Sequence, residues 1–318
     1  MVGDTANLTR ELGLRLLRKL REIRQFEERI IPLYPTDVMV TPVHLHIGQE
    51  AVPVGVCDHL RPKDLLFFGH RTHGPALAKG LDMNRLMAEL FGRTTGCANS
   101  FGGSMHLVDP DNGMLGSSAL VGGGIALGVG AALAAKLEKR DQFCVSWFGD
   151  GAVDSGAFWE SLNFAALKAV PVMFVCEDNG LSNVMEKKDH MFADITEVAG
   201  HFMEVWRADG TDVHSVWSAA GQALRHIRES GKPAFLWCRT KRWMKHQGVE
   251  TDDLECNPVD REKDCPIKKL EKAMKARNLA SDKELDEITQ GIEAQLNAAL
   301  EFAKKSPFPT EDLLMTEV

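Results

Sequence analysis

Apolar residues recur every three or four positions near the start of the chain. Leu12, Leu16 and Leu20 follow this spacing, with Arg, Lys and Glu between them, and Pro32 comes after the last repeat. The period predicts an amphipathic helix over residues 8–31, ended by the proline, with its charged side chains in solvent. Shorter helical patterns occur over 49–60 and 83–92.

Four short apolar runs lack a helical period and instead predict buried strands. They cover residues 65–68, 143–148, 170–176 and 234–238. Helical patterns over 155–168 and 212–230 separate the last three runs. Continuous apolar strands that alternate with helices are typical of an α/β fold with a parallel sheet covered on both faces.

Helices also flank this alternating region. Residues 254–264 are charged and read as a loop, and helical patterns follow over 267–277 and 282–304. No internal repeat or Ser/Gly linker interrupts the chain. We therefore expect a single domain over residues 1–318, with an N-terminal helix at about 8–31 and C-terminal helices at about 266–304.

Two glycine-rich segments differ in pattern. Residues 93–116 have little periodicity, and a long loop of this kind is usually functional. In 122–136, Gly124, Gly128 and Ala132 share one face at helical spacing. Glycine costs about 1 kcal/mol in a helix, so close packing should compensate. Packing within this chain and packing against another subunit both remain open.

Composition narrows the class of protein. The 318 residues carry 37 Lys and Arg against 45 Asp and Glu, a net charge of −8, which disfavours nonspecific nucleic-acid binding. No apolar run reaches the ~18–20 residues of a membrane helix. The seven cysteines form no C-x-x-C pair and read as buried apolar residues of a reducing compartment. Met1 to Thr9 resembles no secretory signal, so a cytoplasmic location is expected.

Polar residues follow two successive predicted strands. Gly149-Asp150-Gly151 follows the second strand, and Asp178-Asn179 follows the third, with 26 residues between Gly151 and Asp178. Ligands of open parallel sheets bind at the carboxyl ends of strands, so Asp150 and Asn179 are expected to face one crevice. A carboxylate and an amide oxygen suit Mg²⁺ or Ca²⁺, and the glycines permit close approach of a pyrophosphate.

Further sequence blocks accompany this pair of strand ends. They are His44 with Gly48-Gln49-Glu50-Ala51, His70-Arg71-Thr72-His73-Gly74, Gly102-Gly103-Ser104-Met105-His106, Gly113-Met114-Leu115-Gly116, Gly122-Gly123-Gly124-Ile125, Glu160-Ser161-Leu162-Asn163, Asp209-Gly210-Thr211-Asp212 and Asp264-Cys265-Pro266-Ile267. The strand ends resemble the thiamine diphosphate fingerprint. With the other blocks, over roughly residues 10–310, the chain resembles the α subunit of 2-oxo acid dehydrogenase E1 components, nearest to the acetoin dehydrogenase α and pyruvate dehydrogenase E1 α types.

This resemblance implies a thiamin diphosphate-binding fold with a Mg²⁺ site. Asp150, Asn179 and the backbone carbonyl of Leu181 would bind the metal ion. Residues that would contact the diphosphate of the cofactor are Gly151, Ala152, Arg71 and His70, and Asn179 would also contact the cofactor. Arg71 would do so by charge-assisted hydrogen bonds.

The resemblance also assigns residues around the rest of the cofactor. Gly113 and Leu115 would hold its aminopyrimidine through backbone contacts. His246 and His44 match histidines near the substrate, and His246 would also contact the cofactor. Histidine suits a proton donor to a developing alkoxide because imidazole titrates in the required range. The remaining histidines are expected to be structural or on the surface.

A partner chain is part of what the resemblance implies. Thiamine enzymes activate the cofactor with a glutamate from a separate pyrimidine-binding domain, and the α-type match uses this whole chain. A β subunit would supply that glutamate in an α₂β₂ assembly with cofactor sites between chains. The small-residue face at Gly124 and Gly128 would fit such helix packing. A lipoyl acyltransferase (E2) is a further expected partner, whereas nucleic acid and membrane are not.

The implied reaction is C–C bond cleavage of a 2-oxo acid or acetoin, with acyl transfer to lipoamide. Several positions depart from the family pattern. They are Asp178, Asp154-Ser155-Gly156, the segment from Lys241 to Gln247 and the following loop to Glu262. Because these cluster near substrate and acceptor positions, acyl transfer to a non-lipoamide carbonyl acceptor (acyloin-type synthesis) stays an alternative, as does a non-catalytic scaffold subunit. A Rossmann NAD enzyme is disfavoured because no Gly-x-Gly-x-x-Gly turn follows a first strand.

Overall fold

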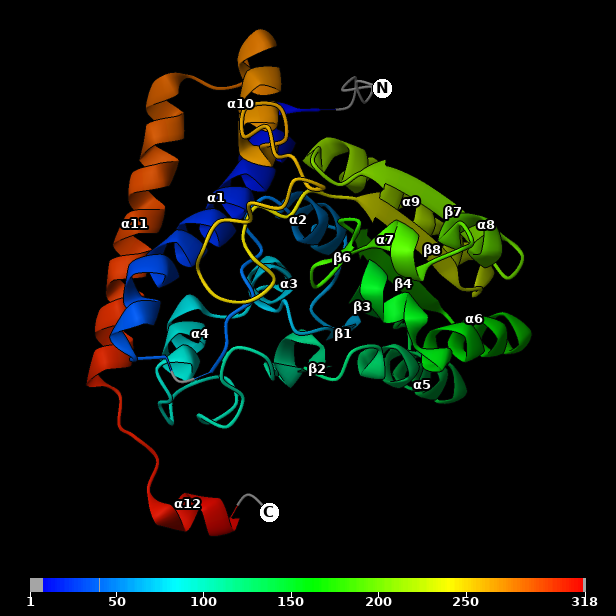
Figure 1. Ribbon diagram of the computed structural model, residues 1–318, viewed down its shortest axis with the longest axis horizontal. Helices are drawn as coiled ribbons and strands as arrows, with labels where there is room; N and C mark the ends of the chain where they lie inside the picture. The colour runs from blue at the N-terminus through cyan, green and yellow to red at the C-terminus, as the bar shows by residue number, and fades with distance from the viewer. Residues whose placement is uncertain (1–7, 40, 317–318) are drawn as a thin grey trace.

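The computed structural model describes residues 8–39 and 41–316 (Figure 1). Most of the segment from Met1 to Thr9, where no secretory signal is expected, lies outside the described residues. A six-stranded sheet lies at its centre in the order β2-β1-β3-β4-β8-β7, with every neighbouring pair parallel. The strands are β1 Leu65–Phe68, β2 Met114–Ser117, β3 Cys144–Gly149, β4 Val172–Asp178, β7 Glu204–Asp209 and β8 Ala234–Arg239. The predicted α/β class with a parallel sheet is confirmed.

Helices cover both faces of the sheet, and strand residues alternate between them. In β4, Phe174 and Cys176 belong to the apolar cluster on the α5 and α6 side, whereas Met173 and Val175 belong to the opposite cluster. The first face carries α5 Gly123–Leu137, α6 Gly156–Lys168 and α8 Ile195–Gly200, and the second carries α2 Ala51–Cys57, α3 His73–Lys79 and α9 Val213–Ser230. This two-sided burial explains why the central strands are continuously apolar.

The terminal helices pack together on the side of the molecule away from α5 and α6 (Figure 1). The helix α1 Arg10–Leu33 contacts α10 Pro266–Ala276 and α11 Asp282–Lys305, and α11 also packs on α4 Met83–Leu90. The prediction that Pro32 ends the first helix is wrong. The proline lies inside the last turn, and the N–H of Tyr34 still donates to the Ile30 carbonyl, so the turn closes around it.

Several short elements were not predicted. They are α3, β2, β7 and α8, the hairpin β5 Leu181–Ser182 and β6 Met185–Glu186, α7 Lys187–His190, α12 Glu311–Thr316, and the 3₁₀ turns η2 Tyr34–Thr36, η3 Pro110–Asn112 and η4 Asp150–Asp154. β2 lies within the segment expected to be a loop. Both β2 and β7 are edge strands with partly exposed side chains, so neither shows a continuous apolar run.

The small residues of α5 pack against the chain's own sheet. A Cβ on Gly128 would lie 3.0 Å from the Cβ of Ser146 in β3, and one on Gly124 would lie 3.7 Å from the Phe68 carbonyl oxygen. Packing within the chain is therefore shown for Gly124 and Gly128, and a contact of this helix with another subunit stays a prediction.

Charged residues of α1 are not all in solvent, contrary to expectation. Glu27 is fully buried and accepts the backbone N–H of His46, at 2.6 Å to Oε2. It also faces Nδ1 of His73 at 3.2 Å, and Nε2 of His73 lies 2.9 Å from Ser104 Oγ. The helix thus anchors the loops beside the sheet edge through a buried carboxylate.

Six of the cysteines are buried and Cys256 is exposed, and all seven are free thiols. This agrees with the prediction for all but Cys256. Among residues 8–39 and 41–316, no helix combines the length and the apolar character that crossing a bilayer requires.

Candidate active site

The carboxyl ends of β1, β3, β4 and β8 surround a cavity of about 340 Å³. His70 and Arg71 follow β1, Asp150 follows β3, Asn179 follows β4, and His246 comes from the segment after β8. All five line the cavity. Parallel register brings these strand ends to one edge, since Gly149 pairs with Glu177 and Glu177 pairs with Cys238.

Asp150 is buried and only partly satisfied. Its side chain lies at the start of η4 with 1% of the residue exposed, and its Oδ2 has no hydrogen-bond partner. Burial, reinforced by the neighbouring Asp178, raises the pKa of Asp150 to about 7. A buried carboxylate oxygen without a partner is costly unless a cation meets it, so this atom fits a metal ion.

The amide of Asn179 is held in one orientation. Its Nδ2 donates to Oε1 of Gln49 at 3.1 Å, and its Oδ1 accepts the backbone N–H of Leu181 at 3.1 Å. Oε1 of Gln49 also accepts the hydroxyl of Thr240 at 3.0 Å. Asn179 and Leu181 both border the cavity beside Asp150, so an amide oxygen and a backbone segment stand near the buried carboxylate.

Gly151 and Ala152 form the floor of the cavity next to Asp150. A Cβ on Gly151 would lie 2.6 Å from the hydroxyl oxygen of Ser182, so a larger residue would collide with the β5–β6 hairpin. Ala152 is buried and lines the same cavity. The two small residues leave backbone accessible for close contact with a ligand.

Two arginines bring positive charge to the cavity. Arg71 donates to the carbonyl of Leu45, and burial together with nearby Arg242 lowers the pKa of Arg71 to about 10, so it is charged at pH 7. Arg242 is 1% exposed, pairs with Asp252 at 2.6 Å and donates to the Asn183 carbonyl at 2.8 Å. Guanidinium groups in such a site favour an anion such as a diphosphate.

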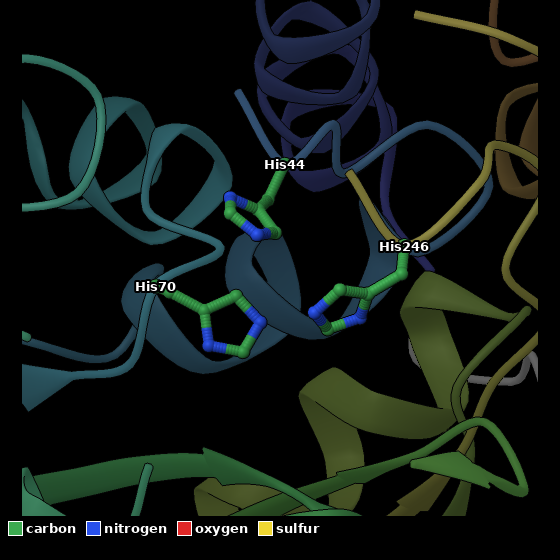
Figure 2. Close-up of side chains that lie close together, drawn as sticks. All are labelled: His44, His70 and His246. Carbon is green, nitrogen blue, oxygen red and sulfur yellow. The ribbon is translucent and has the colours of Figure 1, made fainter. Parts of the chain in front are cut away.

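Three histidines converge at the cavity (Figure 2). The ring centroids of His44 and His70 are 4.5 Å apart, and each lies 5.1 Å from the centroid of His246. Burial is the main cause of a lowered pKa in all three rings. The pKa of His44 falls to about 2, where His70 and Arg71 add repulsion. Beside Arg71, the pKa of His70 falls to about 3 and that of His246 to about 4. All three rings are therefore neutral at pH 7. His70 and His246 line the cavity, and His44 lies behind them.

Gly113 and Leu115 are not brought to the cavity. They lie in and beside β2 at the sheet edge, where the Gly113 carbonyl accepts the N–H of Leu66 at 2.9 Å and Leu115 is exposed. Their backbone contact with an aminopyrimidine stays a prediction.

Sequence reasoning assigned no role to Gln49, Glu177 or Arg242. Gln49 stood within a quoted block, but nothing in its neighbours revealed its bond to Asn179. Glu177 lines the cavity, and its Oε1 lies 2.9 Å from Nε2 of His46. Arg242 stood in a segment noted only for its departures from the family pattern.

The unusual Asp178 is well satisfied. Its Oδ2 accepts Nε1–H of Trp237 at 2.7 Å and pairs with Lys187, while Oδ1 accepts the N–H of Gly180 at 3.0 Å. A second departure, Asp154, lies outside the cavity lining with Oδ2 2.8 Å from Nδ1 of His190. Asp178 does not line the cavity, although its charge helps to raise the pKa of Asp150.

Comparison with known proteins places this site in a family. The model of the dehydrogenase E1 component matches residues 18–312. The chain belongs to the dehydrogenase E1 component family. It is 37% identical over 319 residues to the α subunit of acetoin:2,6-dichlorophenolindophenol oxidoreductase of Bacillus subtilis (strain 168), covering 98% of this chain and 95% of that protein.

Other relatives extend the comparison to pyruvate dehydrogenases. The mitochondrial pyruvate dehydrogenase E1 component subunit α, somatic form, of Homo sapiens is 34% identical over 313 residues, covering 96% of this chain and 79% of that protein. The corresponding chloroplastic subunit α-3 of Arabidopsis thaliana is 34% identical, covering 98% and 75%. The predicted family is confirmed, and with it a thiamine diphosphate-dependent oxidoreductase component of the E1 α type.

Proposed function

We propose that this E1 α chain binds thiamine diphosphate through Mg²⁺ and takes part in C–C bond cleavage of acetoin or a 2-oxo acid. The observation that supports this most directly is the buried, unpartnered Oδ2 of Asp150 beside Asn179 and Gly151. Asp150, the amide oxygen of Asn179 and the carbonyl of Leu181 would hold the metal ion. Arg71 would bind the diphosphate, with Gly151 and Ala152 beneath it.

Held by these residues, the cofactor would supply a nucleophilic carbon for addition to the substrate carbonyl. The chain's own residues hold and protonate the reacting groups. His246 and His70 are neutral imidazoles on the cavity wall, and each has one N–H that can donate to the carbonyl oxygen as negative charge develops. His44 packs edge-on against both rings and orients them. Gly113 and Leu115 would hold the aminopyrimidine once a partner chain covers β2.

The site also needs a carboxylate from outside this chain. The acidic side chains that line the cavity are Asp150 and Glu177, and Glu177 is engaged by His46. A β subunit would supply the activating glutamate, in an α₂β₂ assembly. Exposed Leu120 and Val121 line the cavity at its rim, so a second chain that covers them would also close the site.

Acetoin is our first candidate substrate because the α subunit of the Bacillus acetoin:2,6-dichlorophenolindophenol oxidoreductase is 37% identical over almost the whole chain. Lipoamide of a lipoyl acyltransferase (E2) would accept the acyl group. Acyl transfer to a second carbonyl compound is the alternative acceptor chemistry, because the sequence departs from the family pattern at Asp154-Ser155-Gly156.

Calorimetric titration of thiamine diphosphate with Mg²⁺ into the full chain, alone and with its co-expressed β-like partner, tests the cofactor site. Asp150→Asn keeps the side-chain shape but removes the charge, and we expect at least about tenfold weaker binding. Asp189→Asn, on an exposed residue of α7, is the matched control and should bind normally. Equal binding by Asp150→Asn, or no binding by the wild-type complex, would overturn the proposal.

A further inference from the structure

We propose that His44, His70 and His246 form a second, exchangeable metal site that binds a borderline transition-metal ion such as Zn²⁺. This site is separate in its ligands from the oxygen-lined Mg²⁺ site at Asp150. Each ring offers one nitrogen, and the three ligand atoms lie within 4.8 Å of one another. Figure 2 shows one nitrogen of each ring turned toward the space that the three rings share.

The three histidines come from separate parts of the chain. His44 precedes α2, His70 follows β1, and His246 lies in the segment after β8. Zinc binds imidazole nitrogen at about 2.0–2.1 Å, which puts neighbouring ligand atoms about 3.3 Å apart in a tetrahedral site. The rings would thus move together by at most about 1.5 Å, which side-chain rotation allows.

The rings are chemically ready for a metal ion. Metal binding requires neutral imidazole, and burial keeps the pKa of each ring at about 4 or below, so no proton has to leave at pH 7. His44 is 5% exposed, and its Nδ1 has no hydrogen-bond partner. Three imidazoles with an open fourth position form a donor set that suits Zn²⁺, Cu²⁺ or Ni²⁺, whereas Mg²⁺ prefers oxygen.

The lack of supporting hydrogen bonds sets the strength of the site. Among the described residues, no group donates to or accepts from these three rings. Metal-bound histidines usually gain affinity from a carboxylate or carbonyl on the second nitrogen, and its loss costs 10–100-fold. We therefore expect micromolar, reversible binding. If the proposed function holds, Zn²⁺ and thiamine diphosphate compete, since His70 and His246 line the cofactor cavity.

The test is calorimetric titration of Zn²⁺ into the full chain without thiamine diphosphate, in millimolar Mg²⁺. We expect one Zn²⁺ per chain, and binding at least about tenfold weaker in His70→Gln and in His246→Gln. His201→Gln, on an exposed residue after α8, is the control and should bind like the wild type. Unchanged binding in the double variant His70→Gln/His246→Gln would overturn the proposal.

The visible absorption of Co²⁺ added to the wild-type chain tests the histidine site without relying on a variant that has to fold. A four- or five-coordinate histidine site gives an intense visible band, whereas only weak octahedral absorption would contradict the proposal. Asp150→Asn separates the two ideas. It should keep Zn²⁺ binding while its affinity for thiamine diphosphate falls. If the wild-type chain binds Zn²⁺ but its complex with the β-like partner binds no thiamine diphosphate, the proposed function alone would be overturned.

Discussion

The side chain of Gln49 holds the amide of Asn179, and through it the oxygen proposed to bind Mg²⁺. Its Oε1 accepts from both Asn179 and Thr240, and the residue is 1% exposed. Leucine at this position would fill the space but leave Nδ2 of Asn179 unpaired and free to turn. Losing a hydrogen bond that holds a metal ligand in place typically costs about 10–100-fold in metal affinity, so we expect at least about tenfold weaker Mg²⁺ binding in Gln49→Leu.

Mg²⁺ titration of the thiamine diphosphate-saturated complex checks this expectation. Gln222→Leu, on an exposed residue of α9, makes the same chemical change away from the site and should leave the affinity unaltered. An unchanged Mg²⁺ affinity in Gln49→Leu would show that Asn179 needs no support from this amide.

Single residues also mark the limit of sequence reasoning. Asp178 is visible in the sequence as a departure from the family pattern, but its partner Lys187 is not. The ion pair exists because the β5–β6 hairpin turns the chain back, so that α7 lies over the end of β4. Glu27 is similar, since its burial depends on loops from elsewhere in the chain.

At the scale of elements, Asp58 joins three helices. It caps the end of α2, accepts Nε and Nη2 of Arg15 from α1 at 2.7 and 3.0 Å, and accepts Nε1–H of Trp217 from α9 at 2.8 Å. Burial opposes its charged form, but the bonds from Arg15 and Trp217 outweigh burial and hold the pKa of Asp58 below 3.8.

Asp58→Asn should lower the free energy of unfolding by about 1–2 kcal/mol at pH 7. The expected loss is no larger because Arg15 is half exposed and solvent screens the interaction. The folded-state pKa is depressed, so this stabilisation is complete above about pH 4 and disappears as the pH falls through the folded value. Urea unfolding at pH 7 and at low pH checks both statements. Asp286→Asn, on an exposed residue of α11, is the control. A difference that persists or grows in acid would contradict the assigned charge interaction.

How far elements could be predicted depended on their burial. β3, β4 and β8 are central and covered on both faces, so each is a continuous apolar run that the sequence reveals. The edge strands β2 and β7 mix exposed and buried positions and are defined by pairing with a neighbour. The prediction that Pro32 ends the first helix failed for a similar local reason, because the last turn of a helix can close around a proline.

At the scale of the whole molecule, the position of the cavity could be predicted because the sheet topology determines which strand ends lie together. Once the strands are parallel, Asp150, Asn179, Arg71 and His246 reach one edge without any knowledge of side-chain packing. Arg242 and Glu177 reach the same cavity, but no pattern distinguishes them from other charged residues near strand ends. Gly113 and Leu115 lie away from the cavity, at an edge that this chain leaves open.

Exposed apolar side chains on α5 and α6, on one face of the sheet, give a surface on which we expect a partner chain to pack. Figure 1 shows the two helices next to each other beside the sheet, and they contact each other on one of its faces. Leu127 and Leu137 of α5 and Leu167 of α6 are 57%, 74% and 73% exposed. Large apolar side chains exposed on two helices in contact are typical of surfaces that pack against another protein.

Charge on this surface should therefore disrupt assembly while the chain stays folded. We expect Leu127→Glu/Leu167→Glu to abolish co-purification with the β-like partner, because buried unpaired carboxylates would cost several kcal/mol in the interface. Neither side chain is in the core, so the circular dichroism spectrum and melting temperature of the isolated chain should be unchanged. Met315→Glu, on an exposed residue of α12 that lies apart from these helices, is the control. Normal assembly of the double variant would place the partner on a different face, and the cavity rim at Leu120 and Val121 would then be the next surface to test.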